Sequence, residues 1–495
     1  MSSHRFLAFD LGAESGRAVL GTLEEGKISI RELHRFPNNP ITADGHLHWD
    51  VPSLFQEIKT GMRICAGQIG SDIEGLAVDT WGVDFGLLDK NGRPIGLPYA
   101  YRDLRNVRAM NHFLARFPKE RIYEITGIQF LPFNSLFQLH AWSLEDSDRL
   151  GEAADLLFMP DLMTFLLSGS IANEATIAST SQLIDPRRNA WSEELIEALG
   201  LSPRLFHPPV RPGTVAGRIL PRVAAETGMG EIPVIAAASH DTASAVAAVP
   251  ALGTNWAYIS SGTWSLVGID VPAPLISPDS LRLNFTNEGG LAGRIRLLKN
   301  VSGLWLLQQC RKQWSEGRPL SYEEMVSAAA DAPPFTAFID PDHPDFLNPS
   351  DMPEAIREFC RRTGQAVPSG QGGIIRCALE SLALKYRLVL EELRQVSPHP
   401  IETIHIIGGG SRNELLCRFT AEATGLKVVT GPAEATAIGN VLSQALALGY
   451  VRSPQEIRTV VAASADLKMV EPKDPGAWEP AALRYRDIAG RGNLH

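Results

Sequence analysis

Residues 6–17 read Phe-Leu-Ala-Phe-Asp-Leu-Gly-Ala-Glu-Ser-Gly-Arg, an apolar run that gives way to a polar turn. The four apolar residues before Asp10 predict a short buried strand, and Arg17 opens a second β-prone run. The turn between them contains glycine and serine, whose backbone N–H groups and hydroxyl can bind phosphate oxygens. The stretch therefore predicts a strand, a turn able to bind an anion, and a second strand.

A further turn, Glu24-Glu25-Gly26, separates Arg17–Leu23 from Lys27–Leu33. Two β-prone runs around so short a turn predict a hairpin. Gly21–Ile28 also has the glycine and lysine spacing of a P-loop, but Ile28 stands where the Mg²⁺-binding Ser or Thr should be. A P-loop also lies between a strand and a helix, so we expect the hairpin.

The opening pattern returns near the middle of the chain. Asn255–Ser260 is apolar and β-prone, ends in Ser-Ser-Gly-Thr-Trp-Ser, and continues as Leu266–Gly268. Gly12 and Gly262 occupy corresponding positions 250 residues apart, close to half of the 495 residues. This repeat predicts an α/β protein made of two duplicated domains, residues 1–247 and 248–495, whose two turns clamp a polyphosphate.

Composition narrows the class of protein. The chain is 44% hydrophobic and 21% charged, as globular proteins are, and its net charge is −10. The sequence lacks the basic stripe that is typical of nucleic-acid-binding proteins. It also lacks a stretch of about 18 apolar residues that could span a membrane. Five cysteines without metal-ligand spacing predict free thiols in the cytoplasm, with a Cys360–Cys377 bridge left open.

Several helices and strands can be placed around the two turns. Asp50 is a candidate cap for a helix whose apolar residues from Val51 to Cys65 share one face. Leu76–Val78 and Phe85–Leu88 are expected to pair with each other as strands. Glu434–Leu448 is an Ala/Gly-rich helix suited to close packing, and the last 40 or so residues are expected to form a helical tail.

Ser239-His240-Asp241 follows Pro233–Ala238, a predicted buried strand. Adjacent residues cannot form the relay of a hydrolase triad, because their side chains diverge. A carboxylate at the carboxyl end of an α/β strand lies where ligands bind, and there Asp241 can accept a proton from a bound hydroxyl. A helix N-cap is the alternative role for Asp241, and a structural role is the alternative for His240.

Two other side chains allow more than one interpretation. Asp10 either caps the turn that follows it or holds a hydrated Mg²⁺ beside a phosphate, since Mg²⁺ prefers oxygen ligands. Trp81, within the polar run Asp79–Asp84, either belongs to the core or packs against a sugar ring.

Gly408-Gly409-Gly410 follows an apolar strand, and a helix is expected from about Asn413. The spacing approaches a dinucleotide fingerprint, but Asn413 replaces its last glycine. We expect a mononucleotide rather than NAD at this turn, with a purely structural glycine turn as the alternative.

Taken together, these segments resemble the sugar kinases with the actin-like ATPase fold, the FGGY carbohydrate kinase family. The resemblance runs in order from residue 6 to beyond residue 440. The matching stretches are Asp10–Arg17, Asp79–Leu88, Gly96–Asp103, Gly127–Leu139, Ser239–Val246, Ser260–Leu266, Asn287–Gly290, Leu298–Gln308, Ile406–Asn413 and Gly431–Asn440.

The resemblance implies an activity and a set of site residues. The implied reaction is ATP- and Mg²⁺-dependent phosphorylation of L-rhamnulose at its C1 hydroxyl, in L-rhamnose catabolism; L-fuculose or L-xylulose is the alternative substrate. The implied partners are this small ketose and ATP, without nucleic acid or membrane, for a monomer or small homo-oligomer. The implied residues are Asp241 as catalytic base; Gly82, His240, Asp241, Thr242 and Asn300 at the substrate; Ala13, Glu14, Ser15, Gly16, Arg17, Thr263, Gln308 and Gly409 at ATP; and Asp10 at Mg²⁺ through water.

Two other classes of protein are alternatives to a kinase. An ATP-driven chaperone or filament of the same fold would have nucleotide turnover indifferent to sugar, but the chain has a carboxylate placed to activate a hydroxyl and no peptide-binding β domain. A dinucleotide oxidoreductase would bind NAD tightly and not ATP.

Overall fold

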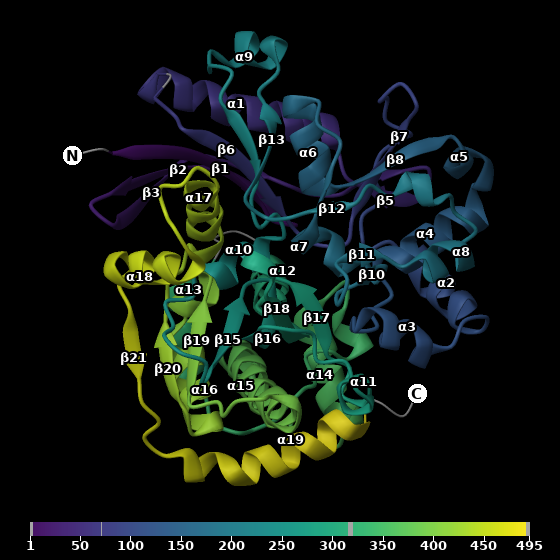
Figure 1. Cartoon of the computed structure of the whole chain (residues 1–495). Helices are drawn as coiled ribbons and strands as arrows, with labels where there is room; N and C mark the ends of the chain where they lie inside the picture. Colours follow the sequence, from purple (N-terminus) through teal and green to yellow (C-terminus); the bar gives the residue numbers. More distant parts are fainter. Residues whose placement is uncertain (1–2, 71, 315–319, 492–495) are drawn as a thin grey trace. The chain divides into compact units, whose positions relative to one another are not determined.

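The structure is a computed structural model that describes residues 3–70, 72–314 and 320–491. The chain forms two compact units, each assembled from segments that are separate in the sequence (Figure 1). The first unit comprises Met1–Pro250, Asp270–Leu297 and Ala435–Ser464. The second comprises Ala251–Ile269, Leu298–Glu434 and Ala465–His495.

A six-stranded sheet, counted over the described residues, forms the centre of the first unit. Its strands, in spatial order, are β13 (Thr214–Arg218), β14 (Pro233–Ala236), β6 (Gly75–Thr80), β1 (His4–Leu11), β2 (Ser15–Glu24) and β3 (Lys27–Pro37). The central strands β14, β6 and β1 are parallel, β13 and β2 run antiparallel to them, and β3 is antiparallel to β2. The carboxyl ends of three neighbouring strands therefore meet at one edge of the sheet.

The predicted hairpin is confirmed. Strands β2 and β3 pair from Ser15↔Pro37 to Glu24↔Lys27, and the two turn residues Glu25 and Gly26 have φ of 51° and 72°. Two consecutive residues with positive φ are what a two-residue hairpin turn of type I′ requires. The P-loop alternative for this segment is thereby excluded.

Several helices of the first unit pack against its sheet. Helix α1 (Val51–Ile69) begins as predicted, since Asp50 accepts a hydrogen bond from the Ser53 backbone N–H, and its apolar side chains pack in the same core as β1 and β6. The other helices of this unit are α2 (Arg105–Leu114), α3 (Lys119–Thr126), α4 (Ser135–Glu145), α5 (Ser147–Gly151), α6 (Met159–Ser168), α7 (Ala175–Ala178), α8 (Glu193–Ala198), α9 (Pro221–Thr227), α10 (Asp241–Ala247), α11 (Pro278–Arg282), α17 (Ala435–Ala447) and α18 (Pro454–Ser464).

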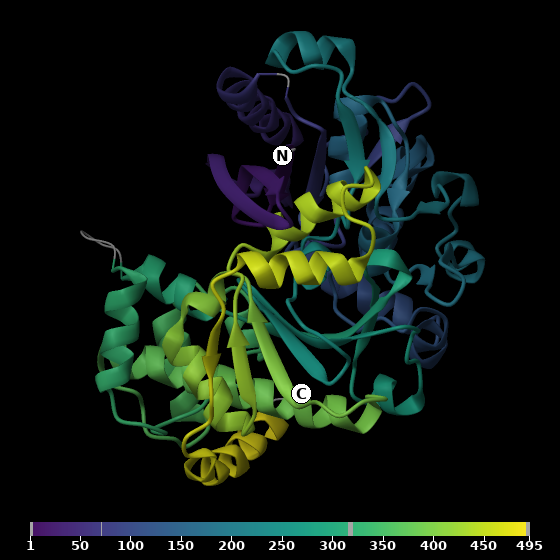
Figure 2. The same ribbon diagram turned by 60° about the vertical axis from the view of Figure 1, so that its left-hand side comes forward.

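Helices α17 and α18 come from late in the sequence yet pack on the N-terminal strands, as the adjacent yellow helices and purple strands of Figure 2 show. Gln444 on α17 donates to the Leu7 carbonyl of β1 (3.1 Å). The Ser464 hydroxyl at the end of α18 accepts from the Ile28 N–H of β3 (2.9 Å).

One predicted strand pair is wrong. Leu76–Val78 lies in β6, which pairs with β1 and β14, whereas β7 (Phe85–Asp89) pairs with β8 (Ala153–Phe158). Both edges of β6 are already occupied, so the chain must leave the sheet after Thr80. It does so through Val83, whose φ of 66° turns the backbone away.

A second sheet repeats this arrangement. The second sheet, over the described residues, has the order β17 (Thr286–Gly289), β18 (Ile295–Ser302), β16 (Trp264–Val271), β15 (Trp256–Ser261), β19 (Thr403–Ile407), β20 (Lys427–Thr430) and β21 (Lys468–Val470). Strands β15 and β16 form an antiparallel hairpin, β15 runs parallel to β19, β19 runs parallel to β20, and β21 is antiparallel to β20. The same relations hold for β1, β2, β6, β14 and β13, so the predicted duplication of an α/β unit is confirmed.

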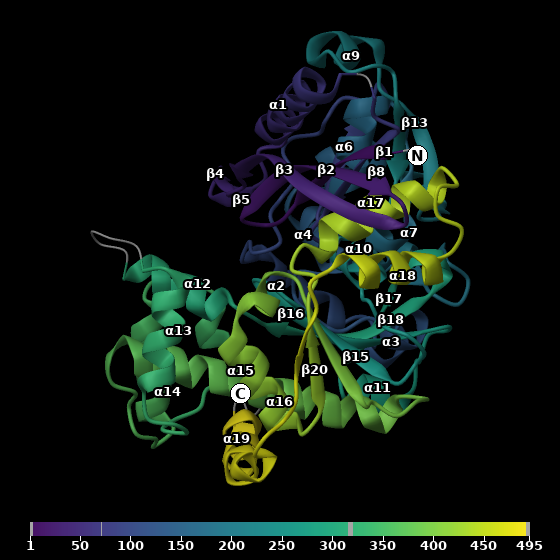
Figure 3. The same ribbon diagram turned by 90° about the vertical axis from the view of Figure 1, so that its left-hand side faces the viewer.

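The helices of the second unit are α12 (Trp305–Gln313), α13 (Tyr322–Asp331), α14 (Met352–Arg362), α15 (Gly370–Val396), α16 (Glu414–Thr424) and α19 (Glu479–Arg491). Figure 3 shows α12, α13 and α14 gathered beside α15. The C-terminal tail is not entirely helical, because β21 precedes α19 and completes the edge of the sheet. The five cysteines all lie in the described residues as buried, free thiols. Among the described helices, none is long and apolar enough to span a membrane.

Candidate active site

The sheet of the first unit brings together three carboxylates that are far apart in the sequence. Asp10 and Asp79 are register partners at the ends of β1 and β6. His240 bridges to Thr80 from the segment after β14, and Asp241 follows it. Because the strands are parallel neighbours, their carboxyl ends place these side chains at the edge where α/β proteins bind ligands.

The first turn is held by backbone hydrogen bonds and by Asn38. The Gly12 N–H donates to the Ser15 carbonyl (2.9 Å), while Asn38 donates through its side chain to the Gly12 carbonyl (2.7 Å) and through its backbone to that of Glu14 (2.9 Å). Ala13, Glu14, Ser15 and Gly16 lie in or directly after this turn. Arg17 stands opposite Asp10 in the hairpin and forms an ion pair with it. Arg17, which was predicted to bind phosphate, therefore neutralises the charge of Asp10, which was predicted to hold Mg²⁺.

Asp79, which was not among the predicted site residues, is fully buried. Its Oδ2 accepts from Asn440 Nδ2 of α17 (2.5 Å), and Gln444 Nε2 in turn donates to Asn440 Oδ1 (2.8 Å). Burial, followed by the nearby charge of Asp10, holds the pKa of Asp79 well above its usual range. Its Oδ1 has no hydrogen-bond partner among the described residues, which is rare for a buried oxygen and is typical of a site that receives water, an ion or a ligand.

Asp241 is the first residue of α10, and the N-cap position belongs to His240. The N-cap role considered for Asp241 is therefore wrong. Its Oδ1 accepts from the backbone N–H (2.5 Å) and the hydroxyl (3.0 Å) of Thr242. Burial, with a further contribution from Asp10, raises the pKa of Asp241 to about 7. A carboxylate with a pKa near neutrality is suited to accept a hydroxyl proton.

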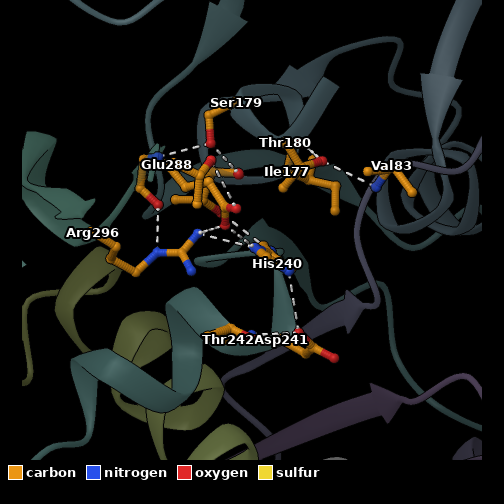
Figure 4. A network of polar contacts seen from close by, with 12 residues as sticks. Val83, Ile177, Ser179, Thr180, His240, Asp241, Thr242, Glu288 and Arg296 are labelled. Carbon is orange, nitrogen blue, oxygen red and sulfur yellow. Dashed lines mark hydrogen bonds and ion pairs between the residues drawn. The ribbon is translucent and has the colours of Figure 1, made fainter. Parts of the chain in front are cut away.

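His240 lies in a buried polar cluster (Figure 4). Its Nδ1 is 2.9 Å from Nη2 of Arg296 and 3.4 Å from Oε2 of Glu288, and its Nε2 is 3.4 Å from Oδ1 of Asp241. The Thr176 hydroxyl accepts from its backbone N–H (3.2 Å). Burial, followed by the charge of Arg296, holds the pKa of His240 well below its usual range, so the imidazole is neutral.

Gly82 lies beside this imidazole, since a Cβ on Gly82 would stand 3.3 Å from His240 Nε2. The next residue, Val83, has φ of 66°, and the Asp84 N–H donates back to the Gly82 carbonyl (2.9 Å), which makes a γ-turn. A β-branched residue in this conformation is strained by about 1–3 kcal/mol. The Thr180 hydroxyl accepts from the Val83 N–H (3.0 Å), which helps to hold the turn.

Trp81 is almost completely buried, which favours the core interpretation. Its indole N–H donates to Asp84 (2.9 Å), which also accepts from the Trp49 indole (2.6 Å), the Tyr101 N–H (3.1 Å) and the Gln138 amide (2.8 Å). Burial raises the pKa of Asp84 to about 6 against these four donors. This carboxylate joins the Gly82–Val83 turn to two tryptophans.

In the second unit, Thr263 and Gln308 lie together, with Gln308 Nε2 3.4 Å from the Thr263 hydroxyl. The Gly408–Gly410 turn follows β19 as predicted, and Asn413 caps α16 by accepting from the Leu416 N–H (3.0 Å). A Cβ on Gly410 would stand 2.0 Å from Ser261 Oγ, so the glycine turn packs against the β15–β16 turn.

Gly409, in contrast, has no atom within 4 Å of the position where a Cβ would be. A flat ligand can therefore approach the Gly409 backbone. Asn300, the remaining predicted substrate residue, lies on β18 within this second unit.

Most of the site residues that the sequence analysis did not predict lie in stretches of the sequence that could have indicated them. Asp79 and Asn440 are the polar ends of two of the stretches that carry the family resemblance, and Glu288 lies in a third. Arg296 lies near the start of β18, outside those stretches, and had no such signal. Only the fold shows that it meets His240, 56 residues away.

Comparison with known proteins agrees with this fold. The N-terminal domain of the FGGY family of carbohydrate kinases matches residues 5–248, and its C-terminal domain matches residues 257–448. A rhamnulokinase of Bacteroides thetaiotaomicron is 48% identical to the chain, covering 97% of it and 99% of the relative, and a rhamnulokinase of Pectobacterium carotovorum is 41% identical, covering 99% of each.

Among solved structures, a gluconate kinase of Lactobacillus acidophilus superposes with a TM-score of 0.83, covering 100% of this chain and 99% of that one at 15% identity. An identity this low bears on the fold alone. Two family domains in order and relatives above 40% identity over nearly the whole chain decide the membership: the chain belongs to the FGGY family of carbohydrate kinases.

Proposed function

We propose that this carbohydrate kinase transfers the γ-phosphoryl group of ATP to the C1 hydroxyl of L-rhamnulose, giving L-rhamnulose 1-phosphate and ADP in L-rhamnose catabolism. The names of the relatives described above support this substrate. One observation carries the chemical role: Asp241 stands at the carboxyl edge of the parallel strands, with its Oδ1 3.4 Å from His240 Nε2, and burial raises its pKa to about 7.

The reaction requires one bond to form and one to break. The C1 oxygen attacks the γ-phosphorus while the bond from that phosphorus to the β–γ bridging oxygen breaks, and ADP leaves with the bond electrons. Asp241 accepts the hydroxyl proton and orients the hydroxyl for in-line attack. Gly82, His240, Thr242 and Asn300 contact the sugar in this proposal.

The ATP-binding residues are proposed in both units: Ala13 to Arg17 in the first, and Thr263, Gln308 and Gly409 in the second. The backbone of each turn and the Arg17 guanidinium donate to phosphate oxygens. Because the chain carries a net charge of −10, these local donors must attract the polyphosphate without help from the overall field.

Mg²⁺, when bound, neutralises charge on the β- and γ-phosphates. The residues suit it, because Asp10 and Asp79 offer carboxylate oxygens and Asp79 Oδ1 has no partner among the described residues. The described residues contain no group of three or more His, Cys, Asp or Glu side chains that could hold a metal ion directly. Asp10 would therefore hold the ion through water.

We also propose a domain boundary, a cellular compartment and an oligomeric state. The boundary between the two domains lies between residues 247 and 248, the protein works in the cytoplasm, and it is a monomer or a small homo-oligomer. Free, buried cysteines support a reducing compartment.

The Asp241→Asn variant tests the role of the base. It keeps the size of the side chain but removes its proton affinity, so kcat should fall by about 10²- to 10⁴-fold while ketose binding, measured by calorimetry, is retained. Asp148→Asn on the exposed surface of α5 is the matched control and should leave kcat unchanged. Near-normal turnover by Asp241→Asn would remove Asp241 from the mechanism.

The substrate is tested by measuring kcat/KM for L-rhamnulose, L-fuculose and L-xylulose with the same enzyme preparation. L-Rhamnulose should have the highest value. A higher kcat/KM for either of the other ketoses would reassign the substrate while leaving the kinase chemistry intact.

A further inference from the structure

The buried contact between Arg296 and His240 fixes which nitrogen of the imidazole carries the proton. Arg296 is completely buried on β18, and its Nε donates to the Gly289 carbonyl (2.9 Å). Its Nη2 lies 2.9 Å from His240 Nδ1. A guanidinium has five N–H donors, no acceptor, and stays protonated in proteins, so His240 Nδ1 must be the acceptor.

A neutral imidazole that accepts at Nδ1 carries its proton on Nε2. That nitrogen points to the catalytic side, 3.4 Å from Asp241 Oδ1 and 3.3 Å from where a Cβ on Gly82 would lie. His240 therefore presents an N–H donor to the carboxylate and to any substrate oxygen next to it. It has no free lone pair with which to take the proton of a substrate hydroxyl.

Glu288 would favour a different protonation state of His240. Its Oε2 is 3.4 Å from His240 Nδ1 and 3.1 Å from Arg296 Nη2. Without the guanidinium, a buried carboxylate beside Nδ1 would favour an Nδ1–H proton and would stabilise the imidazolium. The same histidine would then turn a lone pair, or a full positive charge, toward Asp241.

We propose that Arg296 is a positioning residue that holds His240 as the neutral Nε2–H tautomer, so that His240 donates a hydrogen bond to a sugar oxygen and leaves proton abstraction to Asp241. The sugar contact rests on the proposed function, but the tautomer does not. Substrate atoms that meet His240 must accordingly be hydrogen-bond acceptors, such as a carbonyl or hydroxyl oxygen.

The tautomer is tested by NMR of the full-length chain with ¹⁵N-labelled histidine, in which the His240 signals are identified by their loss in His240→Gln. The wild type should show a protonated Nε2 and an unprotonated Nδ1 at pH 7. Arg296→Met should move the proton to Nδ1 or give the imidazolium. Arg296→Lys keeps one charged donor and should keep the Nε2–H tautomer, as should Glu288→Gln.

Arg294→Met is the matched control. Arg294 is also an ion-paired arginine, bonded to Asp270 (2.8 Å), and Asp270 keeps Arg458 (2.6 Å) when it is lost. This control should leave the His240 spectrum and kcat as in the wild type. Arg296→Met should lower kcat by about 10²- to 10³-fold, as the loss of one preorganised donor does, with the KM for ATP unchanged and partial recovery in Arg296→Lys.

An Nδ1–H proton in the wild type, or an Nε2–H tautomer that persists in Arg296→Met, would overturn the proposal. If Arg296→Met fails to fold, loss of the Nε2–H tautomer in Arg296→Lys overturns it and retention supports it. A wild type with the expected tautomer but no activity on any ketose would refute the proposed function and leave the assignment of Arg296 standing.

Discussion

Substitution of Gly439 tests whether close helix packing holds the catalytic carboxylate in place. Gly439 of α17 lies against the backbone of α10, and a Cβ added to it would stand 1.8 Å from the Ser244 carbonyl oxygen and 2.5 Å from its carbon. Real Cβ contacts are essentially never closer than 3.0 Å, so Gly439→Ala must separate the helices by about 1.2 Å. The obstacle is backbone, which cannot rotate out of the way.

Asp241 lies one turn before Ser244 on the same short helix, so this displacement moves the carboxylate itself. A misplacement of about 1 Å costs about 10²-fold in rate, and overpacking costs about 1–3 kcal/mol of stability. We therefore expect Gly439→Ala to lower kcat about 100-fold, measured by coupling ADP release to an optical signal. Its free energy of unfolding should fall by about 1–3 kcal/mol.

Gly67→Ala is the control, because Gly67 also lies inside a helix but has no atom within 4 Å of the point that an added Cβ would occupy. It should stabilise the protein by up to about 1 kcal/mol through its helix propensity, with kcat unchanged. A Gly439→Ala enzyme with kcat within twofold of the wild type would refute the argument that contact between α10 and α17 positions Asp241.

Three further perturbations follow from the contacts described above. Asp84→Asn should lower the free energy of unfolding by about 1.5–3 kcal/mol in chemical denaturation. An amide cannot accept hydrogen bonds from all four donors, so at least one donor, such as the Gln138 amide, loses its charged acceptor. Burial raises the pKa of Glu174 to about 7, above its ordinary 4.5, so its contribution to stability is complete below pH 4.5 and is lost as the pH rises through 7. The unfolding free energy of the wild type relative to Glu174→Gln should therefore fall by about 2.5 kcal/mol between pH 5 and 8, and a constant difference would contradict the shift. Gly410→Ala, whose Cβ would stand 2.0 Å from Ser261 Oγ, should raise the KM for ATP about tenfold or more by displacing the second turn, with ketose binding unchanged; an unaltered KM for ATP would separate this turn from the nucleotide.

Local features were predictable because neighbouring residues decide them. The hairpin turn at Glu25 and Gly26 requires two positive φ angles, and the cap at Asp50 requires one side-chain oxygen near the next turn of backbone. Both are properties of a few consecutive residues. The Ala/Gly-rich segment from Glu434 likewise predicted close packing, although its partner helix was not predicted.

The error at β6 and β7 has a physical cause. Leu76–Val78 and Phe85–Leu88 both satisfy the composition of a strand, and a short polar segment separates them. Which strand pairs with which depends on the edges that are already occupied, and β6 has β1 on one side and β14 on the other. The sequence of a single strand does not show which other strands will occupy its two edges.

Taken alone, the sequence determined the two strand–turn–strand units, their duplication, and the family whose motifs mark Asp10, Gly82 and Asp241. The tertiary structure alone decided that Asp79 hydrogen-bonds to Asn440 across 361 residues and that Arg296 meets His240. Turns and helix caps depend on steric contacts and hydrogen bonds between residues that are neighbours in the sequence, so a short stretch contains all the residues involved. The protonation of a buried carboxylate or imidazole depends on desolvation and on charges brought from distant segments, and these exist only once the chain has folded.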